Sequence, residues 1–200
     1  ELGYSRDGFH FSRPDRMPLL ASTRCEGDWN RGYLHAVGGV CLVMRDELFI
    51  YFTAFSACSP KLGTGDVGTP GRSRMAMYAG AATGLATIRR DGFVGMEAGA
   101  DGGELTTRPI TFKGNRLFVN VNALQGELRV SVLDRNEKPI DGLNATDCIP
   151  VCLDSTCTQV SWSSGTDLSA VVGQPLRLRF HLRSGGLFSF WVTDDPAGAR

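Results

Sequence analysis

Short runs of alternating apolar and polar residues make up much of the second half of the chain. The clearest are Leu117–Asn122, Leu128–Leu133 and Pro175–Leu182. Alternation places successive side chains on opposite faces of a strand, so that one face is buried and the other is in water. Turn residues separate the runs at intervals of roughly 8–12 residues, which is typical of a sandwich or a barrel. From Thr106 onward we expect about seven or eight strands, enough for one antiparallel β-sandwich.

The first half contains a strong hairpin pattern. Residues 37–44 are apolar and β-branched, and residues 48–52 are apolar. Between them lie Arg45, Asp46 and Glu47, a polar run that predicts a tight turn.

Helical periodicity is nearly absent, and further runs predict strands. The run 74–82 contains several alanines, but Met75, Met77 and Ala79 fit a period of two, so we expect a strand there as well. Other predicted strands cover 108–112, 116–121, 158–162 and 187–192, with polar turns at 113–115 and 134–138. The fold class is therefore expected to be all-β.

Composition and charge exclude several classes of function. The chain is 42% hydrophobic and 9% aromatic, which is enough for a packed core. Its 21 basic and 21 acidic residues balance, so we expect neither nucleic acid nor an anionic membrane surface as a partner. No apolar run is long enough for a transmembrane helix. The opening residues 1–11 contain no signal-peptide pattern, and we expect the chain to begin within a longer protein.

The cysteines form two groups of three, one in each half. They are Cys25, Cys41, Cys58, Cys148, Cys152 and Cys157. The second group has no nearby histidine or fourth thiolate, so its spacing does not favour zinc, and we expect no metal site. An even count and the glycosylation sequon at Asn144 fit disulfides in a secreted, extracellular protein, with free structural thiols as the alternative. The pairing stays open.

One tetrapeptide, Arg-Asp-Gly-Phe, occurs twice, within Ser5–Phe9 and within Arg89–Phe93. Asp-Gly favours a hairpin turn because glycine adopts positive φ without a Cβ penalty. The two copies are either similar turns or one element of a repeated propeller blade.

The run Tyr4–Pro14 resembles the S-x-D-G-x-x-W/F blade motif of five-bladed β-propeller glycosidases, the glycoside hydrolase family 32/43-like proteins. Gly84–Phe93 is similar to the strand that leaves the propeller in that group, and the regions around Gly103–Pro109 and Trp191 resemble its appended β-sandwich. The resemblance covers most of the chain. It implies the C-terminal part of a β-propeller over residues 1–100 and a β-sandwich over residues 101–200.

The resemblance also implies that the chain is catalytically incomplete. About 100 residues supply roughly one and a half blades, and in this family the catalytic carboxylates lie in earlier blades. We therefore assign no catalytic residue and no cofactor. The expected partners are the remainder of the propeller or another copy, joined through unpaired blade edges, and carbohydrate.

Five residues are candidates for sugar contacts. Glu26, Asp28 and Trp29 combine carboxylates with a ring that can stack on a pyranose, although an ordinary loop with a buried tryptophan is the alternative. Tyr33 and His35 share one face of a predicted strand, and the resemblance suggests that this strand is the innermost of a blade. A hydrogen-bonded structural histidine is the alternative there.

No G-x-S-x-G elbow and no phosphate-binding glycine loop is present. The expected function is the C-terminal part of a secreted glycoside-hydrolase-like protein. The alternative is a non-catalytic carbohydrate- or protein-binding β-sandwich module.

Overall fold

The computed structural model describes residues 1–57, 78–163, 165 and 167–199. Strands account for 45% of the chain and helix for 2%, which confirms the all-β class. The chain divides into two compact units, 1–88 and 89–200. This division comes earlier than the expected boundary after residue 100, and the short strand at Met96–Ala98 already pairs within the second unit.

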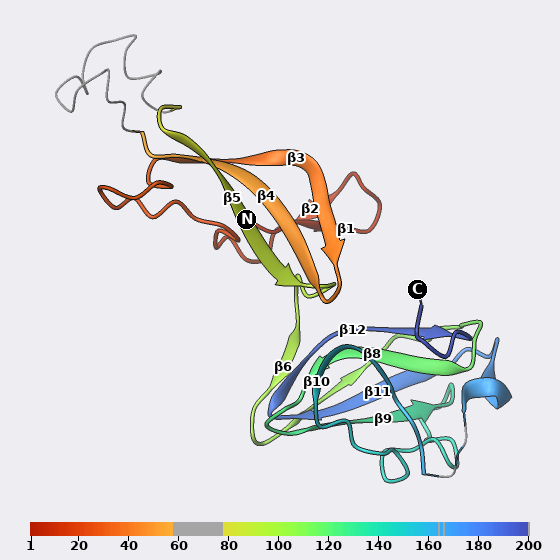
Figure 1. Cartoon of the computed structure of the whole chain (residues 1–200). Coiled ribbons are helices and arrows are strands. Elements are labelled where there is room, and N and C mark those ends of the chain that lie inside the picture. The colour runs from red at the N-terminus through yellow and green to blue at the C-terminus, as the bar shows by residue number, and fades with distance from the viewer. Residues whose placement is uncertain (58–77, 164, 166, 200) are drawn as a thin grey trace. The chain divides into compact units, whose positions relative to one another are not determined.

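The first unit contains a two-stranded and a three-stranded sheet (Figure 1). Its strands are β1 (Tyr4–Ser5), β2 (Phe11–Ser12), β3 (Tyr33–Met44), β4 (Glu47–Phe55) and β5 (Ala81–Arg89), whose last residue belongs to the second unit. The larger sheet has the order β3-β4-β5, so that β3 and β5 are its outer strands.

The predicted hairpin is confirmed and extends beyond its predicted bounds. β3 and β4 pair antiparallel, from Tyr33 opposite Phe55 to Met44 opposite Glu47. The turn between them has Arg45 at a φ of 57°, the left-handed conformation that a tight turn requires. Of the expected strand 74–82, residues 74–77 lie outside the described residues, and β5 begins at Ala81.

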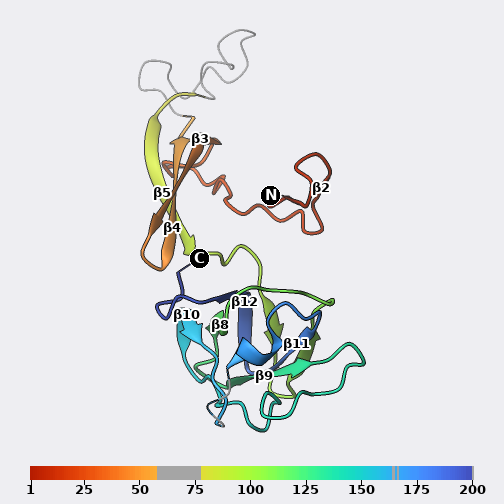
Figure 2. The same cartoon turned by 90° about the vertical axis from the view of Figure 1, so that its right-hand side faces the viewer.

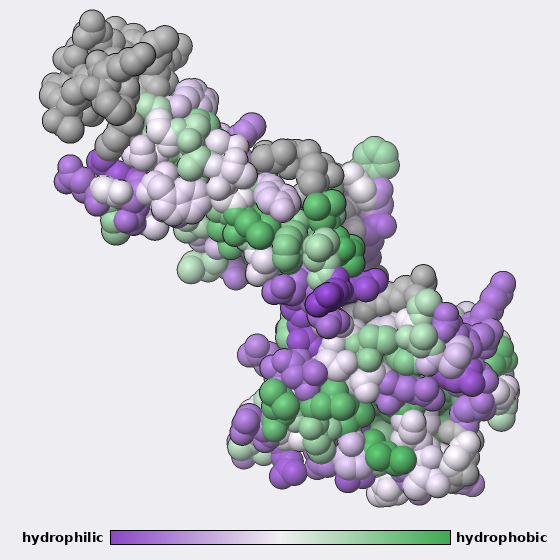
Figure 3. Space-filling view, viewed as in Figure 1, coloured by the Kyte–Doolittle hydropathy of each residue, from purple (hydrophilic) through white to green (hydrophobic). Residues whose placement is uncertain are grey.

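Few side chains of the first unit are buried. Among its described residues, the buried apolar side chains are Leu48, Phe52 and Ala54, all on β4. At the end of β3, Leu42, Val43 and Met44 are exposed. Figure 3 shows apolar residues at the surface of this unit.

The second unit consists of two antiparallel sheets, which Figure 2 shows from the side. Their orders are β10-β8-β12-β6 and β7-β11-β9. The strands are β6 (Met96–Ala98), β7 (Gly103–Thr106), β8 (Arg116–Asn122), β9 (Glu127–Leu133), β10 (Asp154–Gln159), β11 (Arg177–Arg183) and β12 (Gly185–Thr193), and a single 3-10 turn covers Leu168–Val171.

One apolar core joins both sheets. The alternating residues Leu117, Val119 and Val121 of β8 are fully buried, and their counterparts on β9 and β11 enter the same cluster. The rings of Phe180 on β11 and Phe190 on β12 lie 5.0 Å apart, which links one sheet to the other. A core enclosed by two antiparallel sheets is consistent with the expected β-sandwich.

Two predicted strands are wrong in extent. Within 108–112 only Ile110 makes a bridge, to Leu176, because the proline at 109 cannot donate to a ladder. The strand expected at 158–162 begins earlier, at Asp154, and ends at Gln159. Beyond it, Trp162 is buried and its Nε1 donates a hydrogen bond of 3.1 Å to the carbonyl of Val130.

Candidate functional site

A group of partly exposed rings from β3, β4 and the residue Tyr78 just before β5 is the most distinctive surface feature of the first unit. The ring of Tyr33 lies 6.3 Å from His35, 6.1 Å from Phe55 and 5.9 Å from Tyr78, measured between centroids. Phe55 and Tyr78 meet edge to face at 5.5 Å. We call Tyr33, His35, Phe55 and Tyr78 the aromatic cluster.

Strand geometry accounts for the aromatic cluster. Tyr33 and His35 are two residues apart on β3, and Phe55 is the register partner of Tyr33 on β4, so all three side chains share one face. Tyr33 is 36% exposed and Tyr78 is 55% exposed, so that these rings are accessible to a ligand. The predicted proximity of Tyr33 and His35 is therefore seen in the structure, together with two rings that the sequence reasoning missed.

Trp29 lies on the opposite face of the same sheet. Its ring stacks on Phe52 at 5.8 Å, and Phe52 and Phe55 are three residues apart on β4, so they point to opposite sides. A Cβ placed on Gly84 of β5 would lie 2.6 Å from Cη2 of Trp29, which locates the ring directly over this glycine. The structure therefore does not bring Trp29 together with Tyr33 and His35.

The two candidate carboxylates lie in the turn before β3. The amide of Asp28 donates to the carbonyl of Cys25 at 3.3 Å, and the amide of Arg31 donates to the carbonyl of Asp28 at 3.3 Å. Glu26 is exposed and Asp28 is half-buried. Among the contacts of the described residues, none joins either carboxylate to the aromatic cluster.

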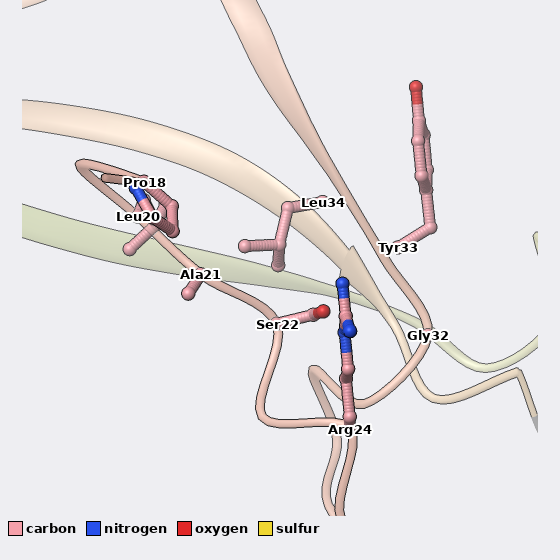
Figure 4. Close-up of a pocket in the computed structure, with 8 residues that line it drawn as sticks. All are labelled: Pro18, Leu20, Ala21, Ser22, Arg24, Gly32, Tyr33 and Leu34. Carbon is pink, nitrogen blue, oxygen red and sulfur yellow. The ribbon is translucent and has the colours of Figure 1, made fainter. Parts of the chain in front are cut away.

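An open pocket of about 440 Å³ lies beside the start of β3 (Figure 4). Its polar groups come from Ser22 and Arg24, and Tyr33 stands at its border. Its apolar lining comes from Pro18, Leu20, Ala21 and Leu34. The pocket therefore combines an apolar wall with one cation and one hydroxyl, next to an aromatic ring.

The second unit has a smaller aromatic pair on the outer face of its four-stranded sheet. The rings of Phe118 and Trp191 stack at 5.8 Å with an interplanar angle of 15°. Trp191 is half-buried, and its Nε1 donates a hydrogen bond of 3.0 Å to the carbonyl of Gly198. The chain beyond β12 thus contacts this pair.

The expected disulfides are not present among the described cysteines. Cys25, Cys41 and Cys152 are exposed thiols, and the exposed Cys157 donates through Sγ to the carbonyl of Ala197 at 3.7 Å. Cys148 lies in the core, where its Sγ accepts a hydrogen bond of 3.3 Å from the amide of Val130. Burial raises the pKa of the Cys148 thiol. The physical reason for the difference is that Cys148 is used as a small apolar core residue. Cys58 lies outside the described residues.

Asn144 begins a turn in the second unit. Its Oδ1 accepts hydrogen bonds from the amide of Thr146 at 2.9 Å, the hydroxyl of Thr146 at 2.6 Å and the amide of Asp147 at 3.0 Å. The sequon is thus folded into an Asx-turn with Asn144 half-buried.

Within the described part of the chain, no group of histidine, cysteine, aspartate or glutamate side chains could hold a metal ion. None of the described helical segments has the length and apolar character needed to cross a bilayer. Comparisons of the chain with protein-family models, with curated proteins and with solved structures gave no match.

Proposed function

We propose that this chain is the C-terminal part of a secreted, glycoside-hydrolase-like protein, in which the first unit contacts carbohydrate and the second is a β-sandwich. The observation that carries the proposal is the aromatic cluster, in which Tyr78, just before β5, meets the rings of Tyr33, His35 and Phe55 from β3 and β4. The resemblance of Tyr4–Pro14 to a propeller blade motif supports the same class.

The aromatic cluster offers what a sugar ring requires. The apolar faces of Tyr33 and Tyr78 can pack against the C–H face of a pyranose, while their hydroxyl groups and the imidazole of His35 can hydrogen-bond to sugar hydroxyls. The pocket beside Tyr33 adds the guanidinium of Arg24 and the hydroxyl of Ser22. Binding here would use stacking for affinity and a few polar groups for orientation.

The proposal assigns binding to this chain, and it assigns glycosidic cleavage to carboxylates outside it. Hydrolysis needs two carboxyl groups about 5–10 Å apart across the sugar. Glu26 and Asp28 lie in the turn before β3, outside the aromatic cluster. A propeller-like parent would supply the missing pair from other blades.

Unpaired strand edges support a protein partner. The outer strands β3 and β5 present backbone groups along the two edges of their sheet, and the exposed Leu42, Val43 and Met44 lie at the end of β3. Another strand added there would satisfy the backbone and cover these side chains. We propose that the remainder of the propeller, or a second copy of the chain, provides it.

The test is affinity electrophoresis of the chain in gels that contain soluble neutral polysaccharides of differing linkage. We expect retardation by at least one polysaccharide, weakened about tenfold or more by Tyr33→Ala and by Tyr78→Ala, which corresponds to about 1.4 kcal/mol. Tyr4→Ala is the matched control, because Tyr4 is 54% exposed but lies outside the aromatic cluster. Absence of binding, or equal loss in the control, contradicts the proposal.

Reducing-sugar release from the same polysaccharides separates binding from cleavage. We expect none from this chain, and release that survives purification would contradict the assignment of cleavage to other blades. Secretion is tested by expression in a eukaryotic secretory pathway: a glycan on Asn144, lost in Asn144→Gln, supports it.

A second candidate places the sugar contact on the sandwich. The half-buried ring of Trp191 favours it, because this ring is held on the outer sheet face by stacking on the buried Phe118. Loss of polysaccharide binding in Trp191→Ala, with binding intact in Tyr33→Ala, would favour this candidate over the aromatic cluster.

A further inference from the structure

Three polar side chains form a hydrogen-bonded chain across the outer face of the sheet β7-β11-β9. Oγ of Ser131 lies 3.1 Å from Nε2 of His181, and Nδ1 of His181 lies 3.0 Å from Oε1 of Glu104. The strand register produces this order. Glu104 on β7 is directly opposite His181 on β11, and Ser131 on β9 is two residue pairs further along, opposite Arg179 on the same face.

The hydrogen bonds determine which nitrogen of His181 carries a hydrogen and which can accept one from Ser131. An ionised carboxylate is only an acceptor, so the Nδ1 of His181 carries the hydrogen that it donates to Glu104. Nε2 then has a free lone pair and accepts the hydrogen bond of the Ser131 hydroxyl. A hydroxyl bonded to a base, and a base oriented by a carboxylate, is the arrangement that activates a serine nucleophile.

Ser131 points away from the core. Its neighbours Val130 and Val132 are fully buried in the core cluster, so alternation directs the Ser131 side chain to the outer face. Ser131 is nevertheless only 4% exposed, whereas the side chains of His181 and Glu104 are 29% and 57% exposed. Its neighbours on this face include the long side chains of Arg129 and Arg179, which must move aside before an ester reaches the hydroxyl.

Two arginines flank the serine on the same face. Arg179 is the cross-strand partner of Ser131, and Arg129 is two residues before it on β9. Arg179 donates through Nε to the Thr106 hydroxyl at 2.9 Å, and Arg129 donates through Nη1 to the carbonyl of Cys148 at 2.9 Å. Both guanidinium groups are also paired with carboxylates, Arg129 with Glu127 at 3.1 Å and Arg179 with Glu104 at 3.8 Å and Glu137 at 3.9 Å. The positive charge beside Ser131 is therefore balanced, and activation of the hydroxyl rests on its hydrogen bond to His181.

We propose that Ser131 is a nucleophile toward small carboxylic esters, with His181 as its general base and Glu104 as a positioning residue. Oγ attacks the ester carbonyl carbon while its proton passes to Nε2 of His181. The tetrahedral intermediate expels the alcohol, which takes that proton from Nε2, and the acyl group stays on Oγ. Water then attacks the acyl-serine, gives its proton to Nε2, and releases the carboxylic acid as the proton returns to Oγ.

This activity is independent of the sugar contacts proposed for the first unit. It also requires no G-x-S-x-G elbow, because here the pairing of three strands brings the serine, histidine and glutamate together. The same hydrogen-bonded chain could serve solely to tie these strands together, so the experiment must measure reactivity as well as stability.

The test is reaction of the full chain with an excess of an alkyl fluorophosphonate, followed by mass spectrometry of the peptides. In this reaction Oγ displaces fluoride from phosphorus, and the serine proton leaves through His181. We expect one adduct, on Ser131, formed about 100-fold or more slowly in His181→Gln. Acetyl ester hydrolysis should fall in parallel.

Two variants complete the design. Ser189→Ala removes another strand hydroxyl, one that is buried without a hydrogen-bond partner among the described residues, and should react like the unmodified chain. Glu104→Gln should slow the labelling of Ser131 while the chain stays folded, and Glu104→Asp, which keeps a carboxylate, should restore part of the rate, which loss of a purely structural tie would not do. An unmodified Ser131, an adduct on another serine, or an unchanged rate in a folded His181→Gln overturns the proposal. Mapping the adduct on the unmodified chain requires no variant to fold.

Discussion

Nε of Arg89 donates a hydrogen bond of 2.5 Å to Oδ1 of Asn120, a fully buried side chain on the outer face of β8. Asn120 in turn donates through Nδ2 to the carbonyl of Arg90 at 2.6 Å. The same guanidinium donates to the carbonyl of Val121 at 3.1 Å and lies 4.8 Å over the ring of Phe188. These contacts fix the first residues of the second unit to its four-stranded sheet. Both the oxygen and the nitrogen of the buried Asn120 amide therefore have hydrogen-bond partners.

The first prediction concerns this buried amide. Asn120→Ala should lower the free energy of unfolding of the second unit by about 2–3 kcal/mol, because it leaves the Arg90 carbonyl and one Arg89 donor without their partner. Asn120→Asp keeps the acceptor for Arg89 but places a carboxylate oxygen against the Arg90 carbonyl, and should also destabilise. Urea unfolding followed by circular dichroism measures both effects.

Asn122→Ala is the control for Asn120, because Asn122 is exposed on the same strand and its Oδ1 accepts only a long bond of 3.4 Å from the amide of Leu124. Its effect should stay within about 0.5 kcal/mol. Equal effects at both positions would show that the contact between Arg89 and Asn120 contributes nothing specific.

The second prediction concerns the glycine beneath Trp29. A Cβ at Gly84 would lie 2.6 Å from Cη2 of Trp29 and would also overlap the ring of Phe52, so Gly84→Ala should push the two rings apart. We expect a shifted indole resonance for Trp29 in NMR spectra and a less stable first unit. Gly99→Ala is the control, because a Cβ there meets no atom within 4 Å. An unmoved Trp29 resonance in Gly84→Ala would contradict this packing.

Much of the sandwich could be predicted from alternation alone. The runs around Val119, Val130 and Phe180 became β8, β9 and β11, because each buries one face in a common core. Pairing across the sheets could not be predicted, since the register depends on contacts between residues far apart in the sequence. The same limit explains the missed bonds among Ser131, His181 and Glu104, which lie on three different strands.

The candidate site was predicted only in part, for a similar reason. The period of a strand was enough to place Tyr33 and His35 on one face. The same period could not place Trp29, because this residue precedes the strand in a turn and packs on the other side of the sheet against Phe52. Phe55 enters the aromatic cluster as the register partner of Tyr33, and the turn at Arg45 could not predict this pair, because the register of the hairpin shifts between Ala36 and Cys41.

The third prediction concerns the buried thiol of Cys148. Burial raises the pKa of this thiol, so at any given pH a smaller share of it is in the reactive thiolate form than for an exposed thiol. Iodoacetamide should therefore modify the exposed Cys25, Cys41 and Cys152 well before Cys148. Because the pKa is raised on folding, this group contributes stability at lower pH that is lost as pH rises above about 8.5.

Mass spectrometry of peptides after timed alkylation measures the order of reaction. In urea, where the core is open, all these thiols should react at similar rates, which serves as the control. Rapid modification of Cys148 in the folded chain would contradict its place in the core.

The fourth prediction concerns the turn at Asp7, within the motif that resembles a propeller blade. Oδ1 of Asp7 accepts hydrogen bonds from the amides of His10 at 2.8 Å and Phe9 at 2.9 Å, and Oδ2 lies 2.6 Å from Nδ1 of His10. The bonds from His10, then from Phe9 and Ser5, hold the pKa of the Asp7 carboxyl far below its usual range. Since the folded pKa is lowered, the turn is stabilised above the ordinary carboxyl pKa and should be lost only as pH falls through the lowered value.

Amide chemical shifts of Phe9 and His10 during an acid titration measure this effect. They should stay constant through pH 4, where an ordinary aspartate is half protonated at about pH 3.9, and change only in stronger acid. In Asp7→Asn the amide oxygen can still accept from the backbone, but it carries no charge, so the acid-dependent change should vanish. The largest contributor to the lowered pKa is the backbone amide of His10, which His10→Ala keeps, but the substitution removes the second, the imidazole bond, so the midpoint should move part of the way up toward the ordinary range. A midpoint near pH 4 in the unmodified chain would mean that Asp7 does not hold this turn.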